Sequence, residues 1–257
     1  MSDLNKPSGE TFLSGNSSLI KQEDRIRLSI VKVFDHLKVS MGLLEHRQDK
    51  DAQEYCELLC NYKVLVQAEP HEALTRLLIM IKKLTELLDD HIIIQEVDNS
   101  YCEIVQLYSD LTIDDPETYL SDMAYSLFML ARFRHKNLRF EEAERKYNES
   151  LRIYRRLALD ESIKNRIAVA VVLIDLAALR QETKSEIELS LQCVNEALAL
   201  LYPAKYYEDA IIDALKVIRG WNLDVKKYLR WRGFHHLTYL IDYLDRGIYP
   251  DYSSEEI

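Results

Sequence analysis

The sequence predicts an all-helical protein, and three observations support this prediction. The chain of 257 residues contains only 6 Gly and 5 Pro, about 4% together where roughly 12% is ordinary. No glycine occurs between Gly42 and Gly220, although all-β and parallel α/β proteins need glycine at turns and phosphate-binding loops. Hydrophobic residues make up 47% of the chain and recur at helical spacing, so the helices can share a buried core.

The N-terminal half is predicted to hold four helices after a tail. Residues 1–18 are polar, contain Gly and Pro, and lack the apolar core of a signal peptide, so we expect a flexible tail. Apolar residues then recur at helical spacing from Ile20 to Leu37, and Asp51 is placed to cap the next helix. The third and fourth helices are predicted over Pro70–Leu88 and Val97–Leu111.

The C-terminal half is predicted to continue with six helices. Asp115, Pro116 and Glu117 are typical of an N-cap, a first helical position and an acidic first turn, so a helix should run from Pro116 to about Lys136. Five more are expected near residues 140–158, 162–182, 187–201, 207–219 and 223–246. The last of these should be broken at Gly233. Helices of this kind with short connections form antiparallel hairpins.

The middle of the chain repeats itself. A shift of 46 residues superposes residues 103–131 on residues 149–177 without a gap, and most of the identical positions are apolar or small. The identities pair Glu103 with Glu149, Tyr108 with Tyr154, Leu111 with Leu157, Asp114 with Asp160, Ala124 with Ala170, Leu127 with Leu173, Leu130 with Leu176 and Ala131 with Ala177. A period of this length in a helical chain indicates a solenoid of stacked hairpins, because one hairpin cannot bury its own apolar face.

One segment, Met123–Leu157, resembles a tetratricopeptide repeat (TPR). The family's first-helix positions are matched by Leu127, Leu130 and Ala131, its turn by Asn137–Phe140, and its second helix by Ala143, Tyr147, Ser150 and Leu151. The sequence departs from the family at Arg134, where Tyr is usual, and at Leu138, where Gly is common. The period also exceeds the family's 34 residues, as in variants with elongated helices.

The resemblance implies a fold and a domain organisation. The fold is a right-handed superhelix of antiparallel helical hairpins, a TPR-like α-solenoid. Its parts are the tail at 1–18, helical hairpins at 19–112, TPR-like repeats at 113–204, and capping helices with a short acidic tail at 205–257. The hairpins at 19–112 are either degenerate repeats or an unrelated helical cap.

The resemblance also implies a binding surface. First helices of TPR hairpins line a concave face, and the corresponding positions here are Tyr125, Phe128, Met129, Arg132, His135 and Lys136. This mixture of adaptable apolar and cationic side chains suits a peptide with an acidic end or segment. Because Phe128 and Arg132 replace the Lys and Asn of the family's chaperone-tail clamp, that clamp is absent. The alternative is that some of these side chains pack against the next hairpin.

A second candidate surface lies near the C-terminus, where basic and aromatic residues interleave. The candidate anion-binding residues are Lys226, Lys227, Arg230, Trp231 and Arg232. Such residues hold single-stranded nucleic acid in some proteins, through phosphate contacts and stacking. The other interpretations are a capping helix whose cations face water, or a surface for a partner or a second copy of the chain.

Composition argues against most other classes of function. The net charge of −10 disfavours nucleic acid as a general partner, and no apolar run is long enough to cross a membrane. Four cysteines make no disulfide framework, and Cys56 and Cys60 lack partner ligands, so we expect a reducing cytoplasm and no metal site. No phosphate-binding loop, nucleophile elbow or kinase motif occurs, so we expect neither a cofactor nor catalytic residues.

The sequence therefore predicts a non-catalytic, cytoplasmic scaffold that binds a protein or peptide partner, with a homo-oligomer also open. The rival prediction is a nucleic-acid-associated regulator that uses the C-terminal basic and aromatic residues. An all-helical enzyme of another type also stays open, because active sites can be assembled from distant residues.

Overall fold

The computed structural model describes residues 21–37, 66, 70–87, 91–160, 162–202 and 207–246. Within these ranges the regular structure is helical throughout and contains no strand, so the predicted all-α class is confirmed. The predicted tail at 1–18 and the predicted helix after Asp51, with Cys56 and Cys60, lie outside the described residues. No described helix is both long enough and apolar enough to cross a membrane.

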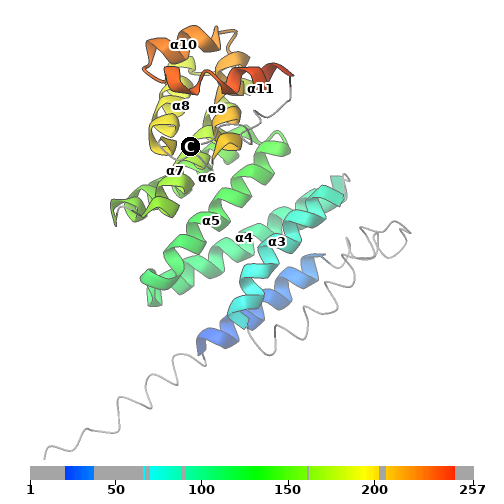
Figure 1. Cartoon of the computed structure of the whole chain (residues 1–257). Coiled ribbons are helices and arrows are strands. Elements are labelled where there is room, and N and C mark those ends of the chain that lie inside the picture. The colour runs from blue at the N-terminus through cyan, green and yellow to red at the C-terminus, as the bar shows by residue number, and fades with distance from the viewer. Residues whose placement is uncertain are drawn as a thin grey trace, which may run out of the picture. The chain divides into compact units, whose positions relative to one another are not determined.

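The first described helix covers residues 21–37. The helices that follow it, labelled as in Figure 1, are α3 (Pro70–Leu87), α4 (His91–Asp114), α5 (Pro116–Lys136), α6 (Phe140–Leu157), α7 (Ile163–Glu182), α8 (Ile187–Leu201), α9 (Glu208–Gly220), α10 (Val225–Trp231) and α11 (Leu240–Arg246). Two short 3-10 helices, η1 (Ala158–Asp160) and η2 (His235–Leu237), lie between them.

Most predicted helix boundaries agree with the structure to within a residue or two. The cap before α5 forms as predicted, because the Asp115 carboxylate accepts a hydrogen bond from the Thr118 amide at 3.2 Å. Helix α4 is longer than predicted at both ends. A hydrogen bond from the Asp115 amide to the Leu111 carbonyl closes its last turn. The predicted C-terminal helix is interrupted at Gly233, whose φ of 83° ends α10.

The chain divides into two compact units, residues 1–129 and 130–257, with the boundary inside α5. In the first unit, the helix at 21–37 runs antiparallel to α4, since Arg25 pairs with Asp114 and Lys32 with Glu103. Helix α3 packs on α4, and the Tyr119 hydroxyl of α5 lies 2.9 Å from Nδ1 of His71 in α3.

In the second unit, α7 is the central helix, because it packs against α6, α8 and α9. A buried guanidinium helps to hold it there. Arg180 of α7 donates from Nε to the Glu144 carboxylate of α6 at 2.9 Å and lies 3.6 Å from the Cys193 sulfur of α8, with only 11% of its side chain exposed. Burial raises the pKa of the Cys193 thiol, which keeps it neutral beside this cation.

The sequence repeat is also visible in the burial of α5 and α7. Ala124 and Ala170 are fully buried, as are Ala131 and Ala177. The same holds for the leucines, because Leu127, Leu130, Leu173 and Leu176 are each 1% exposed. Residues 46 positions apart therefore occupy similar environments, as the repeat predicts.

The repeat continues into the turns that end α5 and α7, beyond the aligned sequence. Leu138 and Lys184 are 46 residues apart, and both adopt the left-handed conformation, with φ of 60° and 51°. Each turn has the two hydrogen bonds of a Schellman motif. After α5 the Arg139 amide donates to the Arg134 carbonyl and the Leu138 amide to the His135 carbonyl. After α7 the Ser185 amide donates to the Arg180 carbonyl and the Lys184 amide to the Gln181 carbonyl. Asn222, with φ of 57°, ends α9 in the same way.

Candidate partner-binding face

The shared turn geometry aligns the three helices α5, α7 and α9 position by position. With Leu138, Lys184 and Asn222 as reference, Arg132 corresponds to Ala178 and Lys216, and His135 corresponds to Gln181 and Arg219. Helix α7 packs against α9, and Arg132 of α5 contacts α7 directly. We use the name α5/α7/α9 face for the second-unit surface formed by Arg132, His135, Lys136, Asp175, Ala178, Glu182, Asp213 and Lys216.

Two of the predicted face residues do not offer an accessible surface. Phe128 is 6% exposed and Met129 is 5% exposed, so both are packing residues, and the expectation that they contact a partner is corrected. The residues equivalent to Phe128, Ile174 and Ile212, are also buried, so this helix position belongs to the core in all three helices. Spacing alone could not separate it from the neighbouring surface positions.

The other four predicted residues keep some exposure. Tyr125 is 40% exposed but falls in the first unit, whereas Arg132, His135 and Lys136 fall in the second. Arg132 and Lys136 are exposed, and His135 is half-buried. The polar part of the predicted set therefore lies together at the C-terminal end of α5, and its apolar part does not join it at the surface.

An ion pair joins α5 to α7 on this face. The Nε atom of Arg132 lies 3.1 Å from Oδ2 of Asp175, whose side chain is only 24% exposed. Burial raises the pKa of Asp175 to about 6, with a further contribution from Asp213, although the charges of Arg132 and His135 oppose this shift. A carboxyl group with a pKa raised by burial is typical of a functional site, and structural ion pairs also shift pKa values.

A hydrogen-bonded row runs beside this ion pair. Nδ1 of His135 lies 3.4 Å from the Tyr147 hydroxyl of α6, and Nε2 lies 3.0 Å from Oε2 of Glu182 in α7. Burial, and then the nearby Asp175 carboxylate, raise the pKa of the Tyr147 phenol, so it keeps its proton and can donate to Nδ1. The imidazole of His135 is therefore held between Tyr147 of α6 and Glu182 of α7.

The α9 part of the face is also charged. Nζ of Lys216 lies 2.7 Å from Oδ1 of Asp213, and both side chains are more than half exposed. Arg219 instead turns toward α11, where it pairs with Asp245. The face therefore carries charge pairs between α5 and α7 and within α9, and it can recognise an extended peptide by exchanging these partners for those of the ligand.

No family model, no curated protein and no solved structure matches this chain. The α5/α7/α9 face therefore has to be interpreted from its own residues. The face provides hydrogen-bond donors and acceptors on α5, α7 and α9. Among the described residues, no group of three or more His, Cys, Asp or Glu side chains is arranged to hold a metal ion.

The predicted anion-binding residues form a separate surface. Lys226, Lys227, Arg230 and Trp231 lie on α10, and Arg232 is its C-cap. All five are exposed, and Trp231 is 74% exposed. The opposite side of α10 is buried, so the helix has both the packing face expected of a cap and a cationic outer face.

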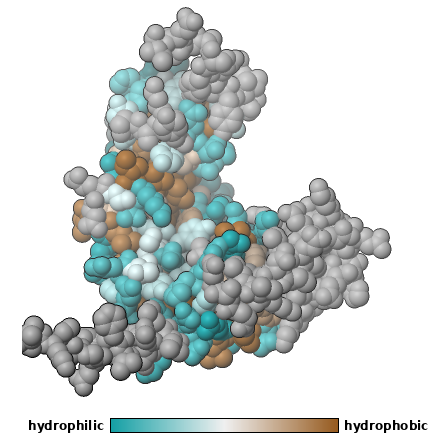
Figure 2. Space-filling model, turned by 60° about the horizontal axis from the view of Figure 1, so that its bottom comes forward, coloured by the Kyte–Doolittle hydropathy of each residue, from teal (hydrophilic) through white to brown (hydrophobic). Residues whose placement is uncertain are grey.

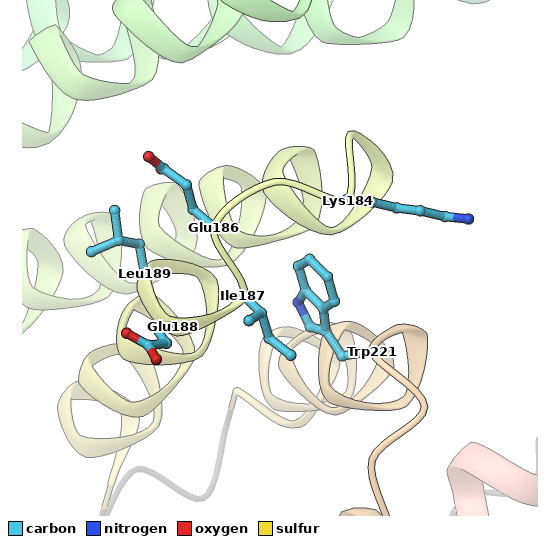
Figure 3. Close-up of a pocket in the computed structure, with 6 residues that line it drawn as sticks. All are labelled: Lys184, Glu186, Ile187, Glu188, Leu189 and Trp221. Atoms are coloured by element: carbon cyan, nitrogen blue, oxygen red, sulfur yellow. The ribbon is translucent and has the colours of Figure 1, made fainter.

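The structure also has an open pocket that the sequence did not predict. A cavity of about 390 Å³ lies between the turn after α7, the start of α8 and the end of α9, lined by Lys184, Glu186, Ile187, Glu188, Leu189 and Trp221. Figure 3 shows the Trp221 ring standing beside Ile187, while Lys184 and Glu186 point away from it. The indole is held in place because Nε1 of Trp221 donates to the Ser190 hydroxyl at 2.9 Å.

Proposed function

We propose that this chain is a non-catalytic, TPR-like scaffold in the cytoplasm that binds a protein or peptide partner on its α5/α7/α9 face. In this proposal the hairpins stack in a right-handed superhelix, and the face is its concave surface. The observation that carries the proposal is the pairing of polar side chains between the neighbouring helices α5 and α7 on one face, Arg132 with Asp175 and His135 with Glu182.

The charges on the face favour a ligand that carries an acidic end or segment. Arg132, Lys136 and Lys216 are exposed cations on two of the three helices. Asp175 is the least exposed acid among them, and its raised pKa shows that its ionised form is penalised by burial. A carboxylate from a ligand could therefore share or replace it as the acceptor for Arg132 at low cost.

The test is capture of a partner from an extract of the native host by the purified chain. The double substitution Arg132→Ala with Lys216→Ala should reduce capture of the partner at least tenfold. Loss of the two cations slows association with an acidic ligand and removes charged hydrogen bonds to it. The matched control is Arg145→Ala with Arg152→Ala, which removes two exposed cations from α6.

Phe128 is unsuitable for this test, since truncating a buried Phe costs about 3–5 kcal/mol and would unfold the unit rather than report on binding. Circular dichroism should confirm that both double variants keep their helix content. Equal capture by the wild type and the α5/α7/α9 variant would contradict the proposal.

A further inference from the structure

The outer face of α10 carries a group of cations, most of which have no ion pair among the described residues of the second unit. Some cations elsewhere in the unit meet acids across helices, as Arg155 meets Glu196 at 2.6 Å and Arg219 meets Asp245. On α10, by contrast, the described part of the chain provides no ion pair for Lys226, Arg230 or Arg232.

One acid lies at the start of α10, and it is already used. The Asp224 carboxylate caps the helix by accepting a hydrogen bond from the Lys227 amide at 3.0 Å. Its other oxygen lies 3.9 Å from Nζ of Lys227. Asp224 therefore compensates one cation of four, and the surface keeps a strong positive charge. We call this surface, formed by Lys226, Lys227, Arg230, Trp231 and Arg232, the α10 patch.

The patch is presented on a rigid support. Val225, Tyr228 and Leu229 of α10 are buried, and the Tyr228 hydroxyl donates to Oδ1 of Asn195 in α8 at 2.9 Å. The helix cannot roll without breaking this bond and exposing these side chains. A ligand that contacts the outer face would therefore bind a preformed surface, which reduces the entropy lost on binding.

Trp231 distinguishes the patch from an ordinary solvated helix face. It is 74% exposed, and the guanidinium carbon of Arg232 lies 4.2 Å from its ring centroid. This cation–π contact holds the indole in one orientation while leaving most of its surface in water. In the view of Figure 2, hydrophobic residues gather in small groups among hydrophilic ones. Single exposed apolar residues are common on protein surfaces. A fixed, exposed Trp among four cations is instead the composition of a binding hot spot.

From these features we infer that the α10 patch is a second docking surface, and that its ligand is an extended acidic peptide with an apolar side chain beside its carboxylates. Lys226 and Arg230 are one helical turn apart, a rise of about 6 Å. Alternate residues of an extended chain are separated by roughly 6.6 Å on the same side. Two carboxylates at alternate positions of the peptide can therefore meet these two cations while an apolar side chain contacts Trp231.

A peptide fits the patch better than single-stranded nucleic acid does. Non-specific sites for single strands stack successive bases on several aromatic rings, whereas in the patch Trp231 is exposed and Tyr228 is buried. The chain also has a net charge of −10, which opposes the approach of a long polyanion more than that of a short peptide.

The test measures fluorescence anisotropy of labelled probes with the full-length chain. The probes are synthetic nonapeptides in which Glu alternates with Ser around a central Phe, Leu or Ile, the same peptides with Lys in place of Glu, and an oligouridine. We expect at least one acidic peptide to bind, the basic peptides not to bind, and the affinity to fall as salt is raised from about 50 to about 200 mM.

Two α10 variants and one control locate the binding. The charge reversal Lys226→Glu with Arg230→Glu, and separately Trp231→Ala, should each weaken acidic-peptide binding at least tenfold, and neither removes a buried side chain. Arg145→Glu with Arg152→Glu makes the same change of charge on the exposed side of α6 and should alter binding less than twofold.

Three outcomes would overturn the inference. These are no binding of any acidic peptide up to millimolar concentration, equal binding by the α10 and α6 reversals, or oligouridine binding that depends on the patch while the peptides do not bind. Because the α10 variants leave Arg132 and Lys216 unchanged, a loss of peptide binding in these variants reports on the α10 patch and not on the α5/α7/α9 face.

Discussion

The raised pKa of Asp175 predicts how the stability of the second unit depends on pH. Burial raises this pKa from 3.8 to about 6, so the folded protein holds a proton at Asp175 more tightly than the unfolded chain does. The stability that this proton contributes is fully present below about pH 4 and is lost as the pH rises through about 6. Replacing Asp175→Asn removes the titration and keeps an oxygen that can accept a hydrogen bond from Arg132.

The magnitude follows from the two pKa values. The difference between 3.8 and about 6, at 1.36 kcal/mol per pH unit, corresponds to about 3 kcal/mol as an upper value. The Asn variant should therefore gain stability relative to the wild type by up to about 3 kcal/mol between about pH 4 and about pH 7. The gain should be smaller if the ion pair with Arg132 strengthens at low salt.

Urea unfolding followed by tryptophan fluorescence is the suitable assay, because both tryptophans, Trp221 and Trp231, belong to the second unit. The control is Glu188→Gln, which removes an exposed carboxylate and should change the free energy of unfolding by no more than about 0.5 kcal/mol at any pH. The reasoning is refuted if the difference between the Asn variant and the wild type stays constant with pH, or if the wild type becomes relatively more stable as the pH rises.

Three further substitutions test the packing of the second unit. Ala143→Leu should overpack a fully buried position and cost about 1–3 kcal/mol in thermal unfolding, and an unchanged midpoint would contradict the close helix contact. Leu138→Gly should relieve the positive φ of 60° and stabilise by about 1 kcal/mol in urea, whereas destabilisation would show that this residue is not strained. Arg180→Leu should cost about 1–3 kcal/mol because it removes a charged hydrogen bond from the partly buried Glu144. Arg155→Ala, which breaks an exposed pair, should cost less than about 1 kcal/mol, and similar losses for the two would contradict the role of burial.

Local signals in the sequence predicted most of the helices. Asp115 and Pro116 marked the start of α5 through capping chemistry that needs only neighbouring residues, and the structure has that cap. Gly233 marked the end of α10 for a similar reason, since glycine adopts a positive φ without strain. Helix starts and stops of this kind depend on a few adjacent residues, so they can be read from one sequence.

The turns after α5 and α7 show where local signals fail. Leu138 and Lys184 adopt the conformation that favours glycine, yet neither residue type indicates it. The equivalent positions became recognisable only from their shared backbone geometry. The repeat of 46 residues could have revealed them, because Arg134 and Arg180 are identical and precede the two turns by the same number of residues.

The candidate face was predictable in part. The resemblance grouped Arg132, His135 and Lys136, which keep some exposure, with Phe128 and Met129, which are buried. Periodicity gives the angle of a side chain around its helix and does not show how far the neighbouring helix covers it. The partners of Arg132 and His135 are 43 and 47 residues away, at Asp175 and Glu182, and only the packing of α7 brings them together.

Site-specific photo-crosslinking tests the central claim, partner binding on the α5/α7/α9 face, most directly. A photoreactive phenylalanine analogue would replace Lys216 on α9 in one protein and Arg152 on α6 in another, since both side chains are exposed cations. After irradiation in an extract of the native host, the account predicts a discrete crosslinked partner from position 216 and none from position 152. The same crosslinked partner from position 152 with none from position 216 would contradict it.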